Sequence, residues 1–255
     1  MTFLFLHPPS IMMVEDVVNP KSLPMKSLIF TLVLLLSFSV VAQKNIHHRW
    51  NQMLEKYVST DGKVNYKDWV SERDNLDKYI ATLTRLPPRE TSSKNAQLAY
   101  WINAYNALTV QLILKHYPLK SIKDITAPWD TKCFKVEGVD YTLGDIEHKV
   151  LRKMNEPRIH FAINCASASC PNLLNTAFQE KQLEQQLKTV TASFLSDKNK
   201  NDLQSSKLKL SKIFLWFAKD FGSKAERLDF IANYSGKSFD KPKIEYLPYD
   251  WSLNE

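Results

Sequence analysis

The spacing of apolar residues predicts helices along most of the chain. Over residues 92–117, apolar side chains return every three or four positions and cover most of a helix circumference, so this helix should be largely buried. Ser92 or Ser93 can cap its first turn, and Pro118 lies just beyond its end. Shorter segments with the same period predict further helices at 46–58, 66–86, 142–154, 178–195, 211–222 and 224–234.

Strands are expected in fewer places. Arg158, His160 and Asn164 alternate with apolar residues over 158–165, which predicts a strand with one apolar face. A small hairpin is expected at 132–142, and short strands are expected at 64–66 and 208–210. Many helices and few strands predict an α+β fold, a predominantly helical single domain with a small β-sheet, over residues 43–255.

The first 42 residues are expected to lie outside this domain. From Met25, one lysine is followed by an apolar run over 28–41 and by small residues before Gln43, the layout of a secretory signal peptide. The run is shorter than the roughly 20 residues that cross a bilayer, so we expect cleavage after Ala42 and no stable membrane anchor. Residues 1–24 would be an upstream extension and 25–42 the signal peptide, and the protein would be exported, periplasmic or secreted.

Composition and charge narrow the function classes. Of the 255 residues, 44% are hydrophobic and 24% are charged, which is typical of a globular protein. A formal net charge of +7 raises the question of an anionic partner. The lysines are spread along amphipathic segments, and there is no basic arm, zinc-finger spacing or nucleic-acid motif, so no nucleic acid is expected as a partner. The residues identify no other partner, and no cofactor is expected.

Chemistry is expected where the predicted strand at 158–165 runs into a loop of small residues. Cys165 and Cys170 flank this loop, and a rigid element that positions a thiol-bearing loop is suited to a functional site. The chain has three cysteines, and an odd number in an exported protein leaves at least one free thiol unless chains pair. A local structural disulfide between Cys165 and Cys170 is the alternative.

A nucleophilic Cys165 would need a base and donors for an oxyanion. His148 can be that base, oriented by Glu147 or Asn103, and backbone N–H groups of the loop after Cys165 can stabilise the oxyanion. His160 is an alternative base, although strand alternation places it on the opposite face from Cys165. The candidate catalytic residues are therefore Cys165, His148, Glu147 and Asn103.

Two asparagines interrupt the apolar helix predicted at 92–117. Asn103 and Asn106 are three positions apart and share a face, and a buried amide without partners is costly. They must therefore meet polar groups, either backbone from a neighbouring loop, which is the commoner partner, or a site. The candidate substrate-binding residues are Asn106, His160, Ser167 and Ser169.

Several segments together resemble the domain of unknown function 547 family. The matching residues are AYWINAYNAL at 99–108, YPLKSIKDI at 117–125, YTLGDIEHKVLR at 141–152, PRIHFAINCASASCPNL at 157–173, LKLSKIFLWFAKDF at 208–221 and YLPYDWSLN at 246–254. The resemblance covers nearly all of residues 60–254 and implies a single, mostly helical mixed domain of unknown activity. It also favours Cys165 as the special thiol.

Two functions remain open on the sequence. One is a cysteine-dependent hydrolase or transferase that acts on an amide or ester. The other is a non-catalytic binding or scaffold domain with structural cysteines. A thiol oxidoreductase is less favoured, because Cys165 and Cys170 stand further apart than in C-x-x-C. No metal site is expected, because His148, His160 and the two cysteines lack close-spaced ligand pairs.

Overall fold

The structure, a computed structural model, describes residues 46–204 and 206–255. Helices dominate this part of the chain, and its strands form a two-stranded and a three-stranded sheet, so the predicted α+β, predominantly helical fold is confirmed. The described residues form one compact unit. The predicted upstream extension and signal peptide lie outside the described residues.

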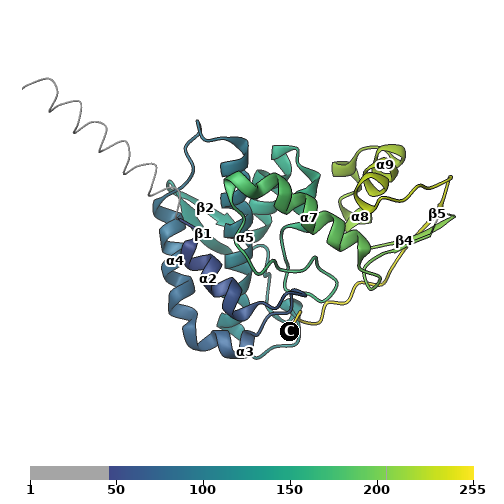
Figure 1. Ribbon diagram of the computed structural model, residues 1–255. Coiled ribbons are helices and arrows are strands. Elements are labelled where there is room, and N and C mark those ends of the chain that lie inside the picture. The colour runs from purple at the N-terminus through teal and green to yellow at the C-terminus, as the bar shows by residue number, and fades with distance from the viewer. Residues whose placement is uncertain (1–45, 205) are drawn as a thin grey trace, which may run out of the picture. The chain divides into compact units, whose positions relative to one another are not determined.

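The first helices build an aromatic core. They are α2 (His48–Tyr57), α3 (Tyr66–Trp69) and α4 (Arg73–Arg85), on the left of Figure 1. The Trp50 ring stacks on Trp69 and Tyr79, with centroids 5.8 and 5.7 Å apart, and all three residues are fully buried. The strand predicted at 64–66 is wrong, because Val64 makes only an isolated bridge to Val58.

The long helix α5 (Lys94–His116) runs through the interior, as its apolar pattern predicts. The Ser93 hydroxyl caps it by accepting a hydrogen bond from the Ala96 N–H at 3.0 Å. Asn103 and Asn106 are 0% and 2% exposed, so the expectation that both amides lie inside is confirmed.

The predicted hairpin at 132–142 is confirmed as β1 (Lys132–Val136) and β2 (Val139–Thr142), which pair antiparallel. The chain then continues through α6 (Leu143–Asp145), a π-helical turn η3 (Ile146–Val150) and the 3-10 helix η4 (Leu151–Met154). The predicted helix at 142–154 is therefore present but irregular, and its irregular turn carries Glu147 and His148.

The strand predicted at 158–165 is wrong, because Pro157–Phe161 forms a 3-10 helix, η5, and a loop follows it. Pro157 suits the first turn of a helix, and the Glu156 side chain accepts the Arg158 N–H. The polar positions of the alternating pattern are buried as deeply as the apolar ones, with His160 only 3% exposed. The alternation therefore does not separate a core face from a solvent face.

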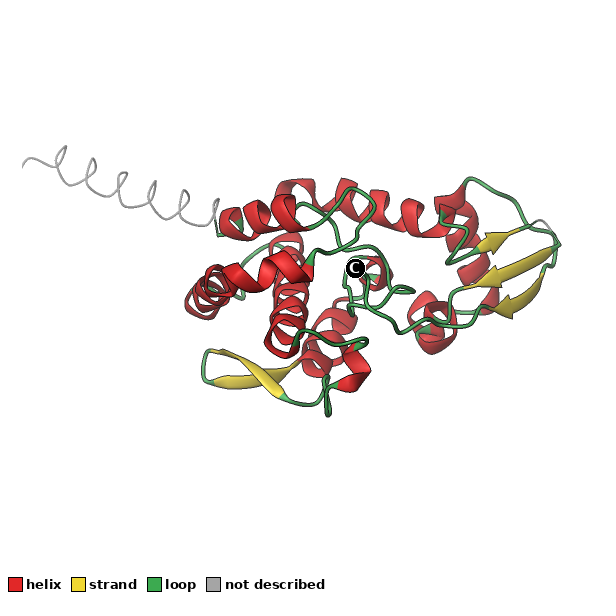
Figure 2. Cartoon of the chain, turned by 90° about the horizontal axis from the view of Figure 1, so that it is seen from below, coloured by secondary structure: helices red, strands yellow, loops and turns green. Residues whose placement is uncertain are grey.

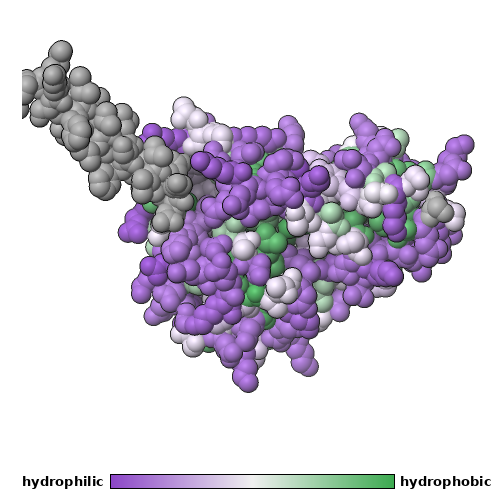
Figure 3. All heavy atoms as spheres, in the orientation of Figure 1, coloured by the Kyte–Doolittle hydropathy of each residue, from purple (hydrophilic) through white to green (hydrophobic). Residues whose placement is uncertain are grey.

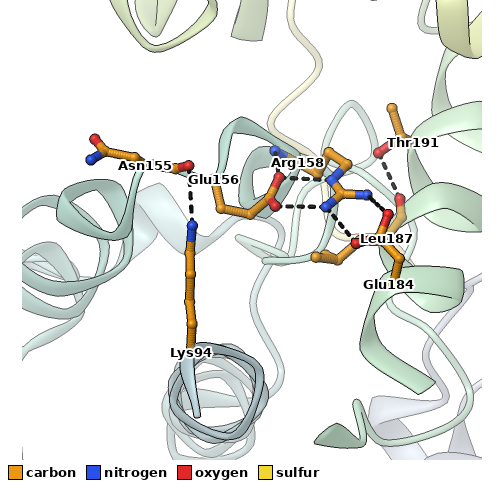
Figure 4. A network of polar contacts seen from close by, with 7 residues as sticks. All are labelled: Lys94, Asn155, Glu156, Arg158, Glu184, Leu187 and Thr191. Carbon is orange, nitrogen blue, oxygen red and sulfur yellow. Dashed lines mark hydrogen bonds and ion pairs between the residues drawn. The ribbon is translucent and has the colours of Figure 1, made fainter. Parts of the chain in front are cut away.

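The buried Arg158 forms ion pairs that connect η5 to α7 (Leu183–Ser196). The Arg158 guanidinium donates to Glu156 Oε2 at 2.6 Å and to Glu184 Oε1 at 2.6 Å, and Figure 4 shows it between these two carboxylates. Two carboxylates compensate the burial of this charge. Of the helix predicted at 178–195, the α-helical part begins at Leu183, after a 3-10 turn at Glu180–Gln182.

The last part of the chain adds the second sheet and two more helices. In this sheet, β4 (Lys207–Leu210) pairs antiparallel with β3 (Asp202–Leu203) and parallel with β5 (Lys243–Tyr246), as Figure 2 shows at the right. Between β4 and β5 lie α8 (Ile213–Trp216), the 3-10 helix η7 (Ala218–Phe221) and α9 (Lys224–Ser235). After β5 the chain returns toward the centre (Figure 1), where the Val64 N–H donates to the Asn254 carbonyl at 2.9 Å.

Hydrophilic residues cover most of the face drawn in Figure 3, with smaller apolar areas between them. Over residues 46–204 and 206–255, none of the helices has both the length and the apolarity of a membrane crossing.

Candidate functional site

A cavity of about 230 Å³ lies where the loop after η5, the π-helical turn, α8 and the C-terminal tail meet. Its polar lining consists of Tyr105, Glu147, His148, His160, Cys165 and Cys170. Its aromatic lining consists of Trp129, Trp216, Phe217, Tyr249 and Trp251. A small number of polar groups among apolar walls is the usual composition of a small-molecule site.

The half-buried Cys165 thiol lies among hydroxyl groups. Its Sγ is 3.2 Å from Ser167 Oγ and 3.4 Å from Tyr249 Oη. A hydrogen bond from the Cys170 thiol is the main reason that the pKa of Cys165 falls to about 7, and the two hydroxyls add to it against the opposing effect of burial. The lowered pKa favours the thiolate, the nucleophilic form of this side chain, near neutral pH.

Buried amides set the backbone around Cys165. Asn106 donates to the Ala162 carbonyl at 2.9 Å and accepts the Asn164 N–H at 2.8 Å. Asn164 Oδ1 in turn accepts the Ala166 N–H at 2.7 Å. Ala166 has a φ of 59°, a left-handed conformation that costs a non-glycine residue about 1–2 kcal/mol. Surrounding hydrogen bonds thus hold a strained turn directly after the thiol.

The C-terminal tail runs alongside the same loop. The Ala168 N–H donates to the Ser252 carbonyl at 2.8 Å, and the Ser169 N–H donates to the Asp250 carbonyl at 3.2 Å. This pairing brings Tyr249 and Trp251 to the cavity wall. It also corrects the expectation of an oxyanion site from several loop N–H groups, because those of Ala168 and Ser169 bond to the tail and that of Ala166 bonds to Asn164.

Glu147 supplies a buried carboxyl group to the cavity. The side chain is 7% exposed and accepts the Tyr105 hydroxyl at 3.3 Å. The pKa of Glu147 is raised to about 7, mainly by burial and in smaller part by the nearby Cys165 thiolate. Negative charge on Cys165 therefore favours the protonated form of the Glu147 carboxyl group. Such a carboxyl group can both donate and accept a proton near neutral pH.

The two histidines lie on the same cavity but have other partners. His160 Nε2 is 2.7 Å from Asp220 Oδ2, and its ring stacks on Phe217 with centroids 4.0 Å apart. Burial lowers the pKa of His160 to about 4 despite Asp220, so this imidazole is neutral at pH 7. His148 Nδ1 accepts from Arg152 at 3.3 Å, and burial, together with Arg152, lowers the pKa of His148.

One family model matches the region of the chain that contains the polar lining residues of this cavity. Residues 88–195 match the model described as a protein of unknown function, DUF547. The chain carries a DUF547 domain. No curated protein and no solved structure matches it. Of the polar lining, Tyr105, Glu147, His148, His160, Cys165 and Cys170 all lie within the matched DUF547 region.

Residues beyond the matched DUF547 region complete the cavity. Trp216, Phe217, Tyr249 and Trp251 all follow residue 195. Trp216 is 46% exposed, and its ring contacts Tyr249 and Trp251 with centroids 4.8 and 5.9 Å apart. Within the described part of the chain, no group of three or more His, Cys, Asp or Glu side chains could hold a metal ion.

The predicted site residues fall into two groups in the DUF547 domain. Cys165, His148, Glu147 and His160 line the cavity, and Ser167 contacts the Cys165 sulfur. Asn103, Asn106 and Ser169 instead hold backbone: the Asn103 amide donates to the Phe178 carbonyl at 2.8 Å and accepts its N–H at 3.0 Å, and Ser169 Oγ accepts the Asp250 N–H at 2.8 Å. A role for any of them in catalysis or substrate binding stays a prediction.

Sequence reasoning missed Tyr249, Trp251 and Trp216 as cavity residues. The aromatic content of the tail was a signal, but which aromatic side chain meets the thiol depends on the pairing of the tail with residues 167–169. It also missed Asp220, which joins His160 to Arg152. Nothing in the local sequence around Asp220 indicates those distant partners.

Proposed function

We propose that Cys165 is the nucleophile of an acyl-transfer enzyme, a cysteine-dependent hydrolase or transferase that acts on an amide or ester. The observation that carries this proposal is a shared cavity in which the Cys165 thiol and the Glu147 carboxyl group both have a pKa of about 7. One group can therefore be a thiolate while the other holds a proton at neutral pH. A nucleophile and a proton donor are the minimum set for acyl transfer.

The reaction would use these groups in order. The Cys165 thiolate adds to the substrate carbonyl carbon, and the carbonyl electron pair moves to oxygen. The Tyr249 hydroxyl, 3.4 Å from the sulfur, is a candidate donor to that oxygen. Collapse of the intermediate expels the amine or alcohol, which takes the proton of Glu147. The Glu147 carboxylate then deprotonates water or an acceptor that attacks the thioester, and Cys165 leaves as the thiolate.

The lining of the cavity limits the acyl group. A volume of about 230 Å³ accommodates only a small group, and six Trp, Tyr and Phe side chains form much of the wall. Flat aromatic or short aliphatic groups pack well against such rings. The substrate is therefore an amide or ester of a small aromatic or aliphatic acid. Export of the protein is part of the proposal and rests on the signal-peptide pattern of residues 25–42.

One observation favours the alternative of a non-catalytic binding domain. Three N–H groups of the loop already have acceptors in Asn164, Ser252 and Asp250, which leaves few backbone donors for an oxyanion. In a binding domain, the aromatic walls would hold a small apolar ligand, and Cys165 would only shape the floor of the cavity.

Acylation of the purified protein distinguishes the two functions. Wild type is incubated with p-nitrophenyl esters of benzoic and butyric acid, and the intact mass is followed with time. We expect an acyl adduct in wild type and in the control Cys133→Ser, which removes the exposed cysteine of β1. Cys165→Ser should form none, and Glu147→Gln should keep the adduct longer because deacylation lacks its base. Equal acylation of Cys165→Ser and wild type would exclude Cys165 as the nucleophile.

A further inference from the structure

Cys165 and Cys170 lie side by side on one turn, and a hydrogen bond links their thiols. Cys170 Sγ accepts the Cys165 N–H at 2.9 Å. Because an N–Cα bond measures about 1.46 Å, the Cys170 sulfur lies within about 4.4 Å of the Cys165 Cα. The Cys170 N–H donates to the Ser167 carbonyl at 3.0 Å and closes the turn that returns the chain. Both side chains line the same cavity, and both thiols are free.

The two thiols differ in access and in acidity. Cys165 is half-buried and contacts hydroxyl groups of Ser167 and Tyr249, whereas Cys170 is only 6% exposed. Burial and the neighbouring Cys165 raise the pKa of Cys170, so it keeps its proton while Cys165 ionises. An accessible thiolate beside a protonated, sheltered thiol is the arrangement of an attacking and a resolving cysteine. The third cysteine, Cys133, is exposed on β1 and does not line the cavity.

We infer that Cys165 is a site of oxidation by hydroperoxides and that Cys170 resolves the product as a local disulfide. The Cys165 thiolate attacks the outer oxygen of the hydroperoxide, the O–O bond breaks, and the departing alkoxide or hydroxide takes one proton. This step leaves a sulfenic acid on Cys165. The Cys170 sulfur then attacks the Cys165 sulfur, and the hydroxyl group leaves as water with the Cys170 proton. The peroxide is reduced by two electrons and the two thiols are oxidised by two electrons.

This inference extends beyond acyl transfer, because it assigns a role to Cys170 that the proposed reaction does not need. The disulfide would block the Cys165 sulfur, so an acyl-transfer activity would be switched off by peroxide and restored by a dithiol. The cross-link itself requires no acyl-transfer activity, and it forms equally if the domain only binds ligands.

Peptide mapping tests the inference on the full chain. The reduced protein is treated with a small molar excess of hydrogen peroxide, alkylated with iodoacetamide and digested with trypsin. Cleavage after Arg158 and Lys181 gives one peptide that holds both cysteines. We expect this peptide to lose two hydrogen atoms and to resist alkylation, and a dithiol should restore alkylation at both positions. The exposed Cys133 should stay open to alkylation throughout, and the control Cys133→Ser should behave as wild type does.

Two variants separate the roles of the cysteines. Cys170→Ser should trap the sulfenic acid on Cys165 as a dimedone adduct, and Cys165→Ser should leave Cys170 reduced. The inference is overturned if wild type keeps both thiols alkylatable after peroxide. It is also overturned if Cys165 proceeds to sulfinic acid while Cys170 stays reduced. Both of these overturning outcomes are measured on the wild-type protein. They therefore do not depend on whether the variants fold or on the result of the ester experiment.

Discussion

The hydroxyl group of Tyr249 lies 3.4 Å from the sulfur of Cys165, although the two residues are 84 positions apart. Ser167 Oγ completes a triangle with them, 3.2 Å from each. Tyr249 belongs to the C-terminal tail, which pairs with the loop through Ala168 and Ser169. The acidity of the thiol therefore depends on a segment outside the matched DUF547 region.

Replacement of this hydroxyl should make the thiol less acidic. Tyr249→Phe removes one donor to the thiolate but keeps the ring against Trp216 and Trp251. A hydrogen bond to a charged group contributes about 1.5–3 kcal/mol, so alkylation of Cys165 near pH 6 should slow by about ten- to a hundredfold. Iodoacetamide labelling followed by mass spectrometry over a pH series measures this. Tyr246→Phe, in β5, is the matched control and should label as wild type does.

Glu147→Gln should stabilise the protein at high pH. The pKa of Glu147 is raised from 4.5 to about 7 in the folded state, mainly by burial, so folding is favoured below pH 4.5 and loses that advantage as pH rises through 7. Above pH 7 the buried carboxylate costs about 3 kcal/mol. Glutamine avoids this cost and can still accept the Tyr105 hydroxyl. Urea unfolding at pH 5 and pH 8 should show a gain confined to the higher pH.

The control for this measurement is Glu90→Gln, which changes an exposed carboxylate before α5. It should leave the difference between the two pH values unchanged. A Glu147→Gln protein that is less stable than wild type at pH 8 would mean that the carboxylate has a compensating partner. Arg152, which favours the charged form of Glu147, would be the residue to examine next.

Replacement of Asn103 and of Asn106 should have similar effects on stability but different effects on the reactivity of the Cys165 thiol. Asn106→Ala leaves the Ala162 carbonyl and the Asn164 N–H without their partner, and Asn103→Ala does the same to both backbone groups of Phe178. Each variant should lose about 2–6 kcal/mol of unfolding free energy, because it leaves two buried groups unpaired and each costs about 1–3 kcal/mol. Only Asn106→Ala should also change the alkylation rate of Cys165.

Each asparagine variant serves as the control for the other. Both come from α5 and both remove the same number of buried hydrogen bonds. Labelling is measured without denaturant at a temperature where both proteins are folded. Equal labelling rates in the two variants would show that Asn106 does not set the conformation of the Cys165 loop.

Sequence patterns predicted the helices because helical periodicity depends on residues within a few positions of each other. The apolar repeat of α5 with its Ser93 cap is an example. The pattern failed at residues 158–165, where Arg158 and His160 are buried with distant partners, Glu184 and Asp220. The sequence does not distinguish a polar residue with a buried partner from one that faces water. The alternating pattern at 158–165 is therefore compatible with the 3-10 helix η5 as well as with a strand.

The site was predictable only in part for a similar reason. The thiol, the carboxyl group and the imidazoles could be named from residue chemistry, and the fold brings Cys165, Glu147 and His148 to one cavity. Which groups contact the Cys165 sulfur could not be predicted from the sequence. Hydroxyl groups of Ser167 and Tyr249, with the Cys170 thiol, occupy the positions around the sulfur where an imidazole was expected.

Asp220 should prove important for stability through the two groups it joins. Arg152 donates to its two oxygens at 2.6 and 2.8 Å, and His160 Nε2 lies 2.7 Å away. Asp220→Asn removes the carboxylate that is hydrogen-bonded to Arg152, and because this cluster is only partly buried we expect a loss of about 1–3 kcal/mol. Asp220 also raises the pKa of His160 against the effect of burial, so that pKa should fall further in the variant. Urea unfolding and imidazole NMR titration measure the two effects, with Asp229→Asn, an exposed position in α9, as the control. An unchanged His160 titration would mean that the contact with Asp220 is absent in solution.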